Sequence, residues 1–335
     1  MPKATVALMA EAATLEPAVA LRRFVENALS PTTVETRPEI VERILAHRLA
    51  TAQHQAAWAG QAAAGLGFDA HDRLGDLAAP TLVQHGAGPP LLLIHGLGYA
   101  RWGWEPVLPG LVERFDVILF DNRGIGESDA PAGPYTVAEM AGDAVRVLDE
   151  SGVERAHVVG TSLGGMIAQE LALSRPERVD RLVLACTTPG GPKAHPMPQA
   201  TVALMAEAAT LEPSVALRRF VENALSPATV ETRPEIVERI LAHRLATAQH
   251  PAAWAAQAAA GMGFDAHDRL GNLAAPTLVQ HGGDDVVVDP GNGDLLVRLI
   301  PDARLLAFPR TGHLFFWEEP SRFVASVVSF LEEAP

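Results

Sequence analysis

The segment Gly160-Thr-Ser-Leu-Gly164 most constrains what this chain can fold into. It follows the apolar, β-branched pair Val158-Val159 and precedes a helical pattern that begins at Met166. A serine in this context lies on a tight strand-to-helix turn, and the flanking glycines leave room for that turn. The turn raises the Ser162 hydroxyl above the sheet and places the Leu163 amide at a helix N-terminus, where it can stabilise an oxyanion. The segment therefore predicts a nucleophile elbow.

Composition excludes several other classes of function. A chain of 335 residues with 48% hydrophobic residues can bury a large core. Its net charge is −14 with both signs interleaved, so we expect no nucleic acid and no membrane surface as partner. No apolar run reaches the length of a membrane span. The single cysteine, Cys186, excludes an internal disulfide bond and is expected to be a small core residue; a reducing compartment fits, and we predict a cytoplasmic protein.

Strand and helix patterns alternate on both sides of the elbow. This alternation indicates a mainly parallel, doubly wound α/β sheet with helices on both faces. The helical segment 197–262 interrupts the alternation, as an inserted cap does. Strands are expected within 89–96, 115–121, 179–186, 275–281 and 304–308, and helices within 106–113, 136–151, 290–300 and 320–332.

Residues 1–86 and 197–282 are nearly identical and differ at seven positions. Solenoid repeats are shorter and need at least three copies, so this is a block duplication. The first copy carries no elbow, and Ala87-Gly88 follows it where Gly283-Asp284 follows the second copy, so it cannot form a second active site. The predicted segments are a duplicated cap-like segment at 1–78, the core at 79–192 and 266–335, and the helical cap at 193–265.

An elbow serine needs a general base, and the base needs a carboxylate to orient it. Asp285 and His313 each follow a predicted strand, in the chain order serine, acid, histidine. Loops at the carboxyl ends of parallel strands share one edge of the sheet, so Ser162, Asp285 and His313 are the predicted catalytic residues. Asp284 and Asp289 compete with Asp285 for the acid role, and the position in the loop favours Asp285.

Three further histidines, His85, His157 and His281, lie at or near strand ends. They lack the partners that a catalytic base needs, and we interpret them as structural. The loop His95-Gly-Leu-Gly98 is expected to supply a second oxyanion donor, the amide of Leu97, beside that of Leu163. An apolar substrate pocket is expected, with candidates Leu97, Trp102, Met166, Met205, Trp254 and Phe315.

Residues 87–335 resemble an α/β-hydrolase of the ester and lactone hydrolase group. The ordered motifs that carry the resemblance are His95-Gly-Leu-Gly98, Asp121-Asn-Arg-Gly-Ile-Gly-Glu-Ser128, Gly160–Gln169, Pro276–Gly282 and Gly312-His313. The surroundings of Ser162 are similar to those in 3-oxoadipate enol-lactonases, acyl-homoserine-lactone-type esterases and cofactor-free haloperoxidases. The resemblance implies an α/β-hydrolase core with a helical cap, and serine at the elbow argues against a haloalkane dehalogenase.

The chain departs from the family's pattern at its start. Such proteins usually open with an antiparallel hairpin, whereas here a second cap copy precedes the His-Gly loop. One hypothesis is that strand 80–85 replaces the lost second strand and that helices 4–65 pack outside the core. The other is that the first copy is a loosely attached product of recent duplication. Either copy can cover the site, and exchange between molecules would give a homodimer.

The sequence thus predicts acyl transfer from a small-molecule ester or lactone to water. His313 accepts the Ser162 proton, and the amides of Leu163 and Leu97 hold the oxyanion. No metal or organic cofactor is expected. Carbon–carbon bond hydrolysis or perhydrolysis can run on the same triad. A non-catalytic scaffold with a duplicated lid, used for assembly or binding, is the rival from another class.

Overall fold

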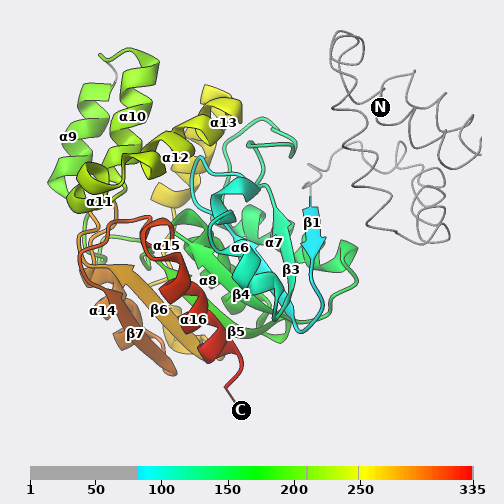
Figure 1. The fold of residues 1–335 in the computed structure, drawn as a ribbon. Coiled ribbons are helices and arrows are strands. Elements are labelled where there is room, and N and C mark those ends of the chain that lie inside the picture. Colours follow the sequence, from blue (N-terminus) through cyan, green and yellow to red (C-terminus); the bar gives the residue numbers. More distant parts are fainter. Residues whose placement is uncertain (1–81, 209, 248, 334–335) are drawn as a thin grey trace, which may run out of the picture. The chain divides into compact units, whose positions relative to one another are not determined.

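A seven-stranded sheet forms the centre of the computed structural model, which describes residues 82–208, 210–247 and 249–333 (Figure 1). The predicted duplicate segment 1–78 lies outside the described residues. The strand order is β1-β3-β2-β4-β5-β6-β7, and every neighbouring pair is parallel except β1 with β3. The mainly parallel, doubly wound sheet is therefore confirmed. The strands are β1 (Leu82–His85), β2 (Pro90–Ile94), β3 (Asp116–Phe120), β4 (Ala156–Thr161), β5 (Val179–Ala185), β6 (Thr277–Gly282) and β7 (Ala303–Phe308).

The central strands are rich in apolar residues because helices cover both faces of the sheet. Leu92 and Ile94 of β2 point into one core cluster, with α7 (Val137–Glu150), α8 (Leu163–Ser174) and α14 (Gly291–Leu299). Leu91 and Leu93 point into the other cluster, with α6 (Leu108–Val112), α15 (Phe315–Glu318) and α16 (Pro320–Leu331). Alternate residues of one strand thus serve two cores, as the period of two along a strand requires.

The helices begin where local chemistry favours a start. In α7, the Thr136 side chain accepts from the Glu139 amide and the Glu139 carboxylate accepts from the Thr136 amide, which forms a capping box. Proline occupies the first turn of α6 and α16, where its missing N–H costs nothing. Short 3-10 turns complete the core: η1 (Arg101–Trp104), η2 (Pro176–Arg178) and η3 (Leu270–Asn272).

Between β5 and β6 the described residues form five α-helices, in the segment where the sequence predicts a cap (Figure 1). They are α9 (Gln199–Ala208), α10 (Pro213–Asn223), α11 (Pro227–Thr232), α12 (Pro234–Ala246) and α13 (Pro251–Met262). The buried Glu318 joins this insertion to the loop before α15, because its carboxylate accepts from Ser226 on one side and from the Gly312 amide on the other. The Leu314 amide also donates to Ala224 O at 2.8 Å. The insertion therefore helps to fix the loop that carries His313.

The predicted strand at 80–85 forms β1 over its described residues and pairs antiparallel with β3 at the edge of the sheet. The pairing agrees with the hypothesis that this strand belongs to the sheet. Among the described residues, no helix is long and apolar enough to cross a membrane.

Candidate active site

Ser162 lies on the sharp turn that joins β4 to α8, with φ 54° and ψ −120°. Residues that carry a side chain rarely adopt a positive φ, so the surrounding packing must hold the Ser162 backbone in this conformation. Glycines make the turn possible: a Cβ on Gly160 would lie 2.3 Å from the carbonyl oxygen of Gly164, and one on Gly164 would lie 2.1 Å from that of Ile94. The predicted strand, elbow turn and helix are all present.

The loop after β2 lies directly against the serine. A Cβ on Gly96 would be 2.9 Å from Ser162 Cβ and 3.4 Å from Ser162 Oγ, so only glycine lets the backbone approach so closely. Leu97 follows in this loop, and Leu163 is the first residue of α8. Among the described residues, neither amide has a hydrogen-bond acceptor. The two predicted oxyanion donors thus lie on the two elements that border Ser162, Leu97 on the loop after β2 and Leu163 at the start of α8.

His95 shapes this loop from within the core. Its ring stacks on Tyr99 with centroids 4.8 Å apart, and its Nδ1 accepts from the Gly96 amide at 2.7 Å. Gly103 also packs against the ring, because a Cβ there would be 2.3 Å from His95 Nε2. Burial lowers the pKa of His95 to about 3, so the ring is neutral at physiological pH. We infer that its role is to hold the loop in place.

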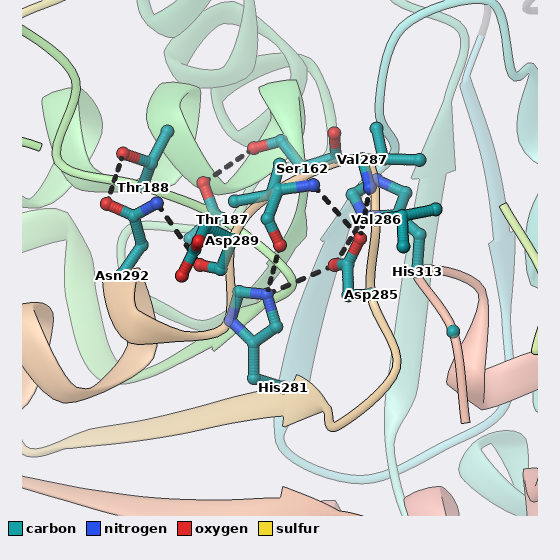
Figure 2. A network of polar contacts seen from close by, with 12 residues as sticks. Ser162, Thr187, Thr188, His281, Asp285, Val286, Val287, Asp289, Asn292 and His313 are labelled. Carbon is teal, nitrogen blue, oxygen red and sulfur yellow. Dashed lines mark hydrogen bonds and ion pairs between the residues drawn. The ribbon is translucent and has the colours of Figure 1, made fainter. Parts of the chain in front are cut away.

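Asp285 is fully buried in the loop after β6, and both of its oxygens are occupied (Figure 2). Oδ1 accepts from the amides of Val287 and Val288 at 2.8 and 2.9 Å. Oδ2 lies 2.8 Å from His313 Nδ1. Asp284, the competing candidate, is exposed, and Asp289 bonds the Gly291 amide in its own turn. The histidine's carboxylate partner is therefore Asp285.

Two opposing effects set the charge of Asp285. Burial raises the pKa of its carboxyl, but the charge of His313 and hydrogen bonds from His281 and His313 outweigh burial and hold that pKa well below its usual range. Because Asp285 is an acceptor-only carboxylate, the proton in the 2.8 Å contact is on His313 Nδ1. His313 Nε2 is then the basic nitrogen, as a base for Ser162 requires.

The interpretation of His281 as lacking partners is wrong. Its Nε2 lies 3.1 Å from Asp285 Oδ2 and 3.1 Å from Val288 O, and the side chain is buried (Figure 2). Both of these oxygen atoms are hydrogen-bond acceptors, so Nε2 carries the proton. Nδ1 is buried without a hydrogen-bond partner. Asp285 thus receives N–H donors from two histidines on one oxygen. The spacing of four residues between His281 and Asp285 was the available signal, but only the turn after β6 brings them together.

Thr187 lies beside Ser162 and was not singled out from the sequence, whereas Cys186 was expected to be a core residue. The Thr187 hydroxyl donates to Ser162 O at 2.7 Å, and its side chain packs on Gly165 of α8. Cys186 is buried at the end of β5, and burial together with the nearby Asp285 carboxylate raises the pKa of its thiol. The protonated thiol is a core residue, as predicted.

The predicted pocket residues divide into three groups. Leu97, Trp102, Met166 and Trp254 are partly buried. A Cβ on Gly261 of α13 would be 3.3 Å from Leu163 Cδ1 and 3.7 Å from the Met166 sulfur, so α13 packs over the elbow. Met205 is 40% exposed on α9. Phe315 has no exposed surface and packs with its ring centroid 4.5 Å from that of Phe308, which is a core position.

Similarity to known proteins agrees with this geometry. Residues 89–320 match the family model described as the alpha/beta hydrolase fold. The chain belongs to the α/β-hydrolase-fold family. The match spans the two halves of the core and the helical insertion between them, and the earlier resemblance is confirmed.

Members of the α/β-hydrolase-fold family that resemble this chain differ in their named reactions. RutD of Azorhizobium caulinodans, named as a carbamate hydrolase, is 33% identical over 74% of this chain and 93% of its own length. A 2-hydroxy-6-oxononadienedioate/2-hydroxy-6-oxononatrienedioate hydrolase of Cupriavidus pinatubonensis is 33% identical over 73% of this chain and 88% of its own length. The crystal structure of the enol-lactonase from Burkholderia xenovorans matches with a TM-score of 0.68 at 25% identity. The match covers 76% of this chain and 96% of the lactonase chain. The family is therefore common to them, while the substrate is not.

Proposed function

We propose that this chain is a serine hydrolase of carboxylic esters or lactones, with Ser162 as nucleophile, His313 as general base and Asp285 as its orienting carboxylate. The observation that carries the proposal is the 2.8 Å contact between Asp285 Oδ2 and His313 Nδ1. It occurs on loops at the same edge of the sheet as the elbow serine, because β4, β6 and β7 are parallel.

The mechanism follows from the protonation states of the side chains. His313 Nε2 accepts the Ser162 proton as the hydroxyl attacks the acyl carbon, and the carbonyl oxygen gains negative charge. The amides of Leu97 and Leu163 stabilise that charge, since neither has another acceptor in the described part of the chain. His313 then protonates the leaving alkoxide and activates water, which releases the acid and restores Ser162.

The test is hydrolysis of p-nitrophenyl esters of short and medium acyl chains, and of a set of lactones, by the full-length protein and by Ser162→Ala. We expect turnover by the wild type and a decrease of about 10³-fold or more in the variant. Thermal unfolding of both proteins controls for folding. Turnover that persists in Ser162→Ala, or no turnover of any ester or lactone by the folded wild type, would overturn the proposal.

Hydrolysis of 2-hydroxy-6-oxo acids is the second candidate. The 33% identity with the hydrolase of Cupriavidus pinatubonensis favours it. The same serine, histidine and carboxylate would act, but a carbon–carbon bond would be cleaved in place of the acyl–oxygen bond. Loss of the absorbance of the dienoate substrate, with esters and lactones left unchanged, would select this activity. Binding of ligands without turnover of any substrate would instead select the non-catalytic scaffold.

A further inference from the structure

The last turns of α12 pack on the chain that follows the predicted oxyanion loop. Arg239 Nη2 and His243 Nε2 contact the two carboxylate oxygens of Glu105 at 2.6 and 2.7 Å. The His243 ring stacks on Trp102 with centroids 4.9 Å apart, and the Trp102 indole donates to Thr247 Oγ1 at 2.8 Å. These contacts fix the position of α12 against the loop.

Arg244 lies in the same turn of α12 and reaches the loop itself. A Cβ on Gly98 would lie 2.7 Å from Arg244 Nη1, so the guanidinium packs directly on this glycine. The guanidinium carbon also lies 5.0 Å from the centre of the Tyr99 ring. Gly96, two residues before Gly98, borders Ser162. A positive charge is therefore placed on the loop that carries the Leu97 oxyanion donor.

This positive charge has no counter-ion in the described part of the chain. Arg101 and Arg239, which lie on either side of the same interface, pair with Asp121 and Glu105. No ion pair is found for Arg244, which is partly buried. Leaving a partly buried charge unpaired costs free energy, and a ligand anion would remove that cost. A guanidinium fits a carboxylate particularly well, because its parallel N–H groups can bind both oxygens.

A local cation would offset the overall charge of the protein for an anionic substrate. The net charge of −14 produces a field that opposes the approach of anions. We propose that Arg244 forms an anion subsite beside the oxyanion loop and selects esters or lactones that bear a free carboxylate on the acyl chain. This inference rests on the proposed esterase or lactonase function and specifies its substrate class. The carboxylate is bound and takes no part in the bond changes.

The test compares two esters of similar acyl length, p-nitrophenyl hemiglutarate and p-nitrophenyl valerate. The readout is the ratio of their kcat/KM values, carboxylate ester over neutral ester. We expect Arg244→Gln to lower this ratio about 10- to 100-fold, the usual size of a charged hydrogen bond. Arg244→Lys should restore part of it, and added salt should weaken the wild-type preference. Arg239→Gln, which removes an arginine of the same helix that is already paired, should leave the ratio within about twofold.

A second measurement does not depend on turnover. Binding of monomethyl glutarate to Ser162→Ala and to Ser162→Ala/Arg244→Gln is measured by calorimetry, with thermal unfolding as the folding control. Ser162-dependent turnover with an unchanged ratio and equal binding to both proteins would overturn the anion subsite and leave Arg244 a structural role on Tyr99. Absence of turnover with Arg244-dependent binding would overturn the esterase function while supporting the subsite.

Discussion

The sequence Leu-Val-Gln-His-Gly occurs twice in this sheet, in different surroundings. As Leu278–Gly282 it forms most of β6, parallel between β5 and β7, and every residue is buried. As Leu82–Gly86 it forms β1 and the glycine after it, antiparallel to β3 at the edge of the sheet. There Gln84 and His85 are exposed. One sequence therefore supplies both an interior strand and an edge strand.

The described connections of the two strands explain the difference. Only four residues separate β1 from β2, which is too short for the crossover that a parallel pair needs. β1 therefore runs opposite to β2 and β3. The chain reaches β6 through the long helical insertion, which permits a parallel crossover. After β6 the chain continues into Asp284-Asp285, whereas the first copy continues into Gly88-Pro89. His281 therefore contacts the Asp285 carboxylate, whereas the position equivalent to Asp285 after His85 is Pro89, which has no carboxylate.

The largest expected effect concerns the carboxylate that follows only the second copy. Asp285→Asn should lower kcat for ester hydrolysis about 10³- to 10⁴-fold, because the amide favours the wrong tautomer of His313. Asp284→Asn, at the exposed neighbouring position, is the matched control and should stay within about twofold. Steady-state kinetics gives kcat for ester hydrolysis by both variants. Equal losses in the two would contradict the assignment of Asp285.

The two histidines at equivalent positions provide the second comparison. His281→Phe removes an N–H donor from Asp285 Oδ2 and should lower kcat/KM about 10- to 100-fold through misplacement of the carboxylate. It should also shift the pH–rate profile, whereas His85→Phe should change neither quantity. His281→Gln, which can still donate from its amide, should recover part of the activity. An unchanged pH profile in His281→Phe would leave His281 with a packing role alone.

The dependence of stability on pH is the third comparison. The pKa of Asp285 is lower in the folded protein than in the unfolded chain, so its stabilising contribution is present above about pH 4 and is lost as pH falls below that value. Between pH 4.5 and 3 the wild type should therefore lose about 1 kcal/mol more unfolding free energy than Asp285→Asn. Urea unfolding of both proteins at several pH values gives the dependence of each unfolding free energy on pH. Parallel curves would show that Asp285 makes no such contribution.

The smallest expected effect separates the two strands by burial alone. Val279→Ala in β6 should cost about 2 kcal/mol of unfolding free energy, because this side chain is fully buried. Val83→Ala at the equivalent position of β1 should cost less than about 1 kcal/mol, since Val83 is only partly buried. Urea unfolding of the two variants gives both values. Equal costs would mean that the edge strand is as important to the core as β6.

Much of the fold could be read from local patterns. The apolar runs predicted the parallel strands, and Thr136 with Glu139 marks the start of α7 where the sequence placed a helix. The spacing of Gly160, Ser162 and Gly164 predicted the elbow, because a turn with this backbone strain tolerates few other residues. The positions of Asp285 and His313 after strands predicted that they would meet, since parallel strands share an edge.

The sequence by itself therefore determined the elements, the elbow and the order of the site residues, because these depend on backbone geometry and hydrophobic period over short stretches of chain. The tertiary structure alone decided which of two identical histidines meets Asp285, and which arginine of α12 packs on Gly98 without a counter-ion among the described residues. Identical local sequences have identical local preferences. Their burial, partners and charge environment are set by the connections and neighbours that surround them in the fold.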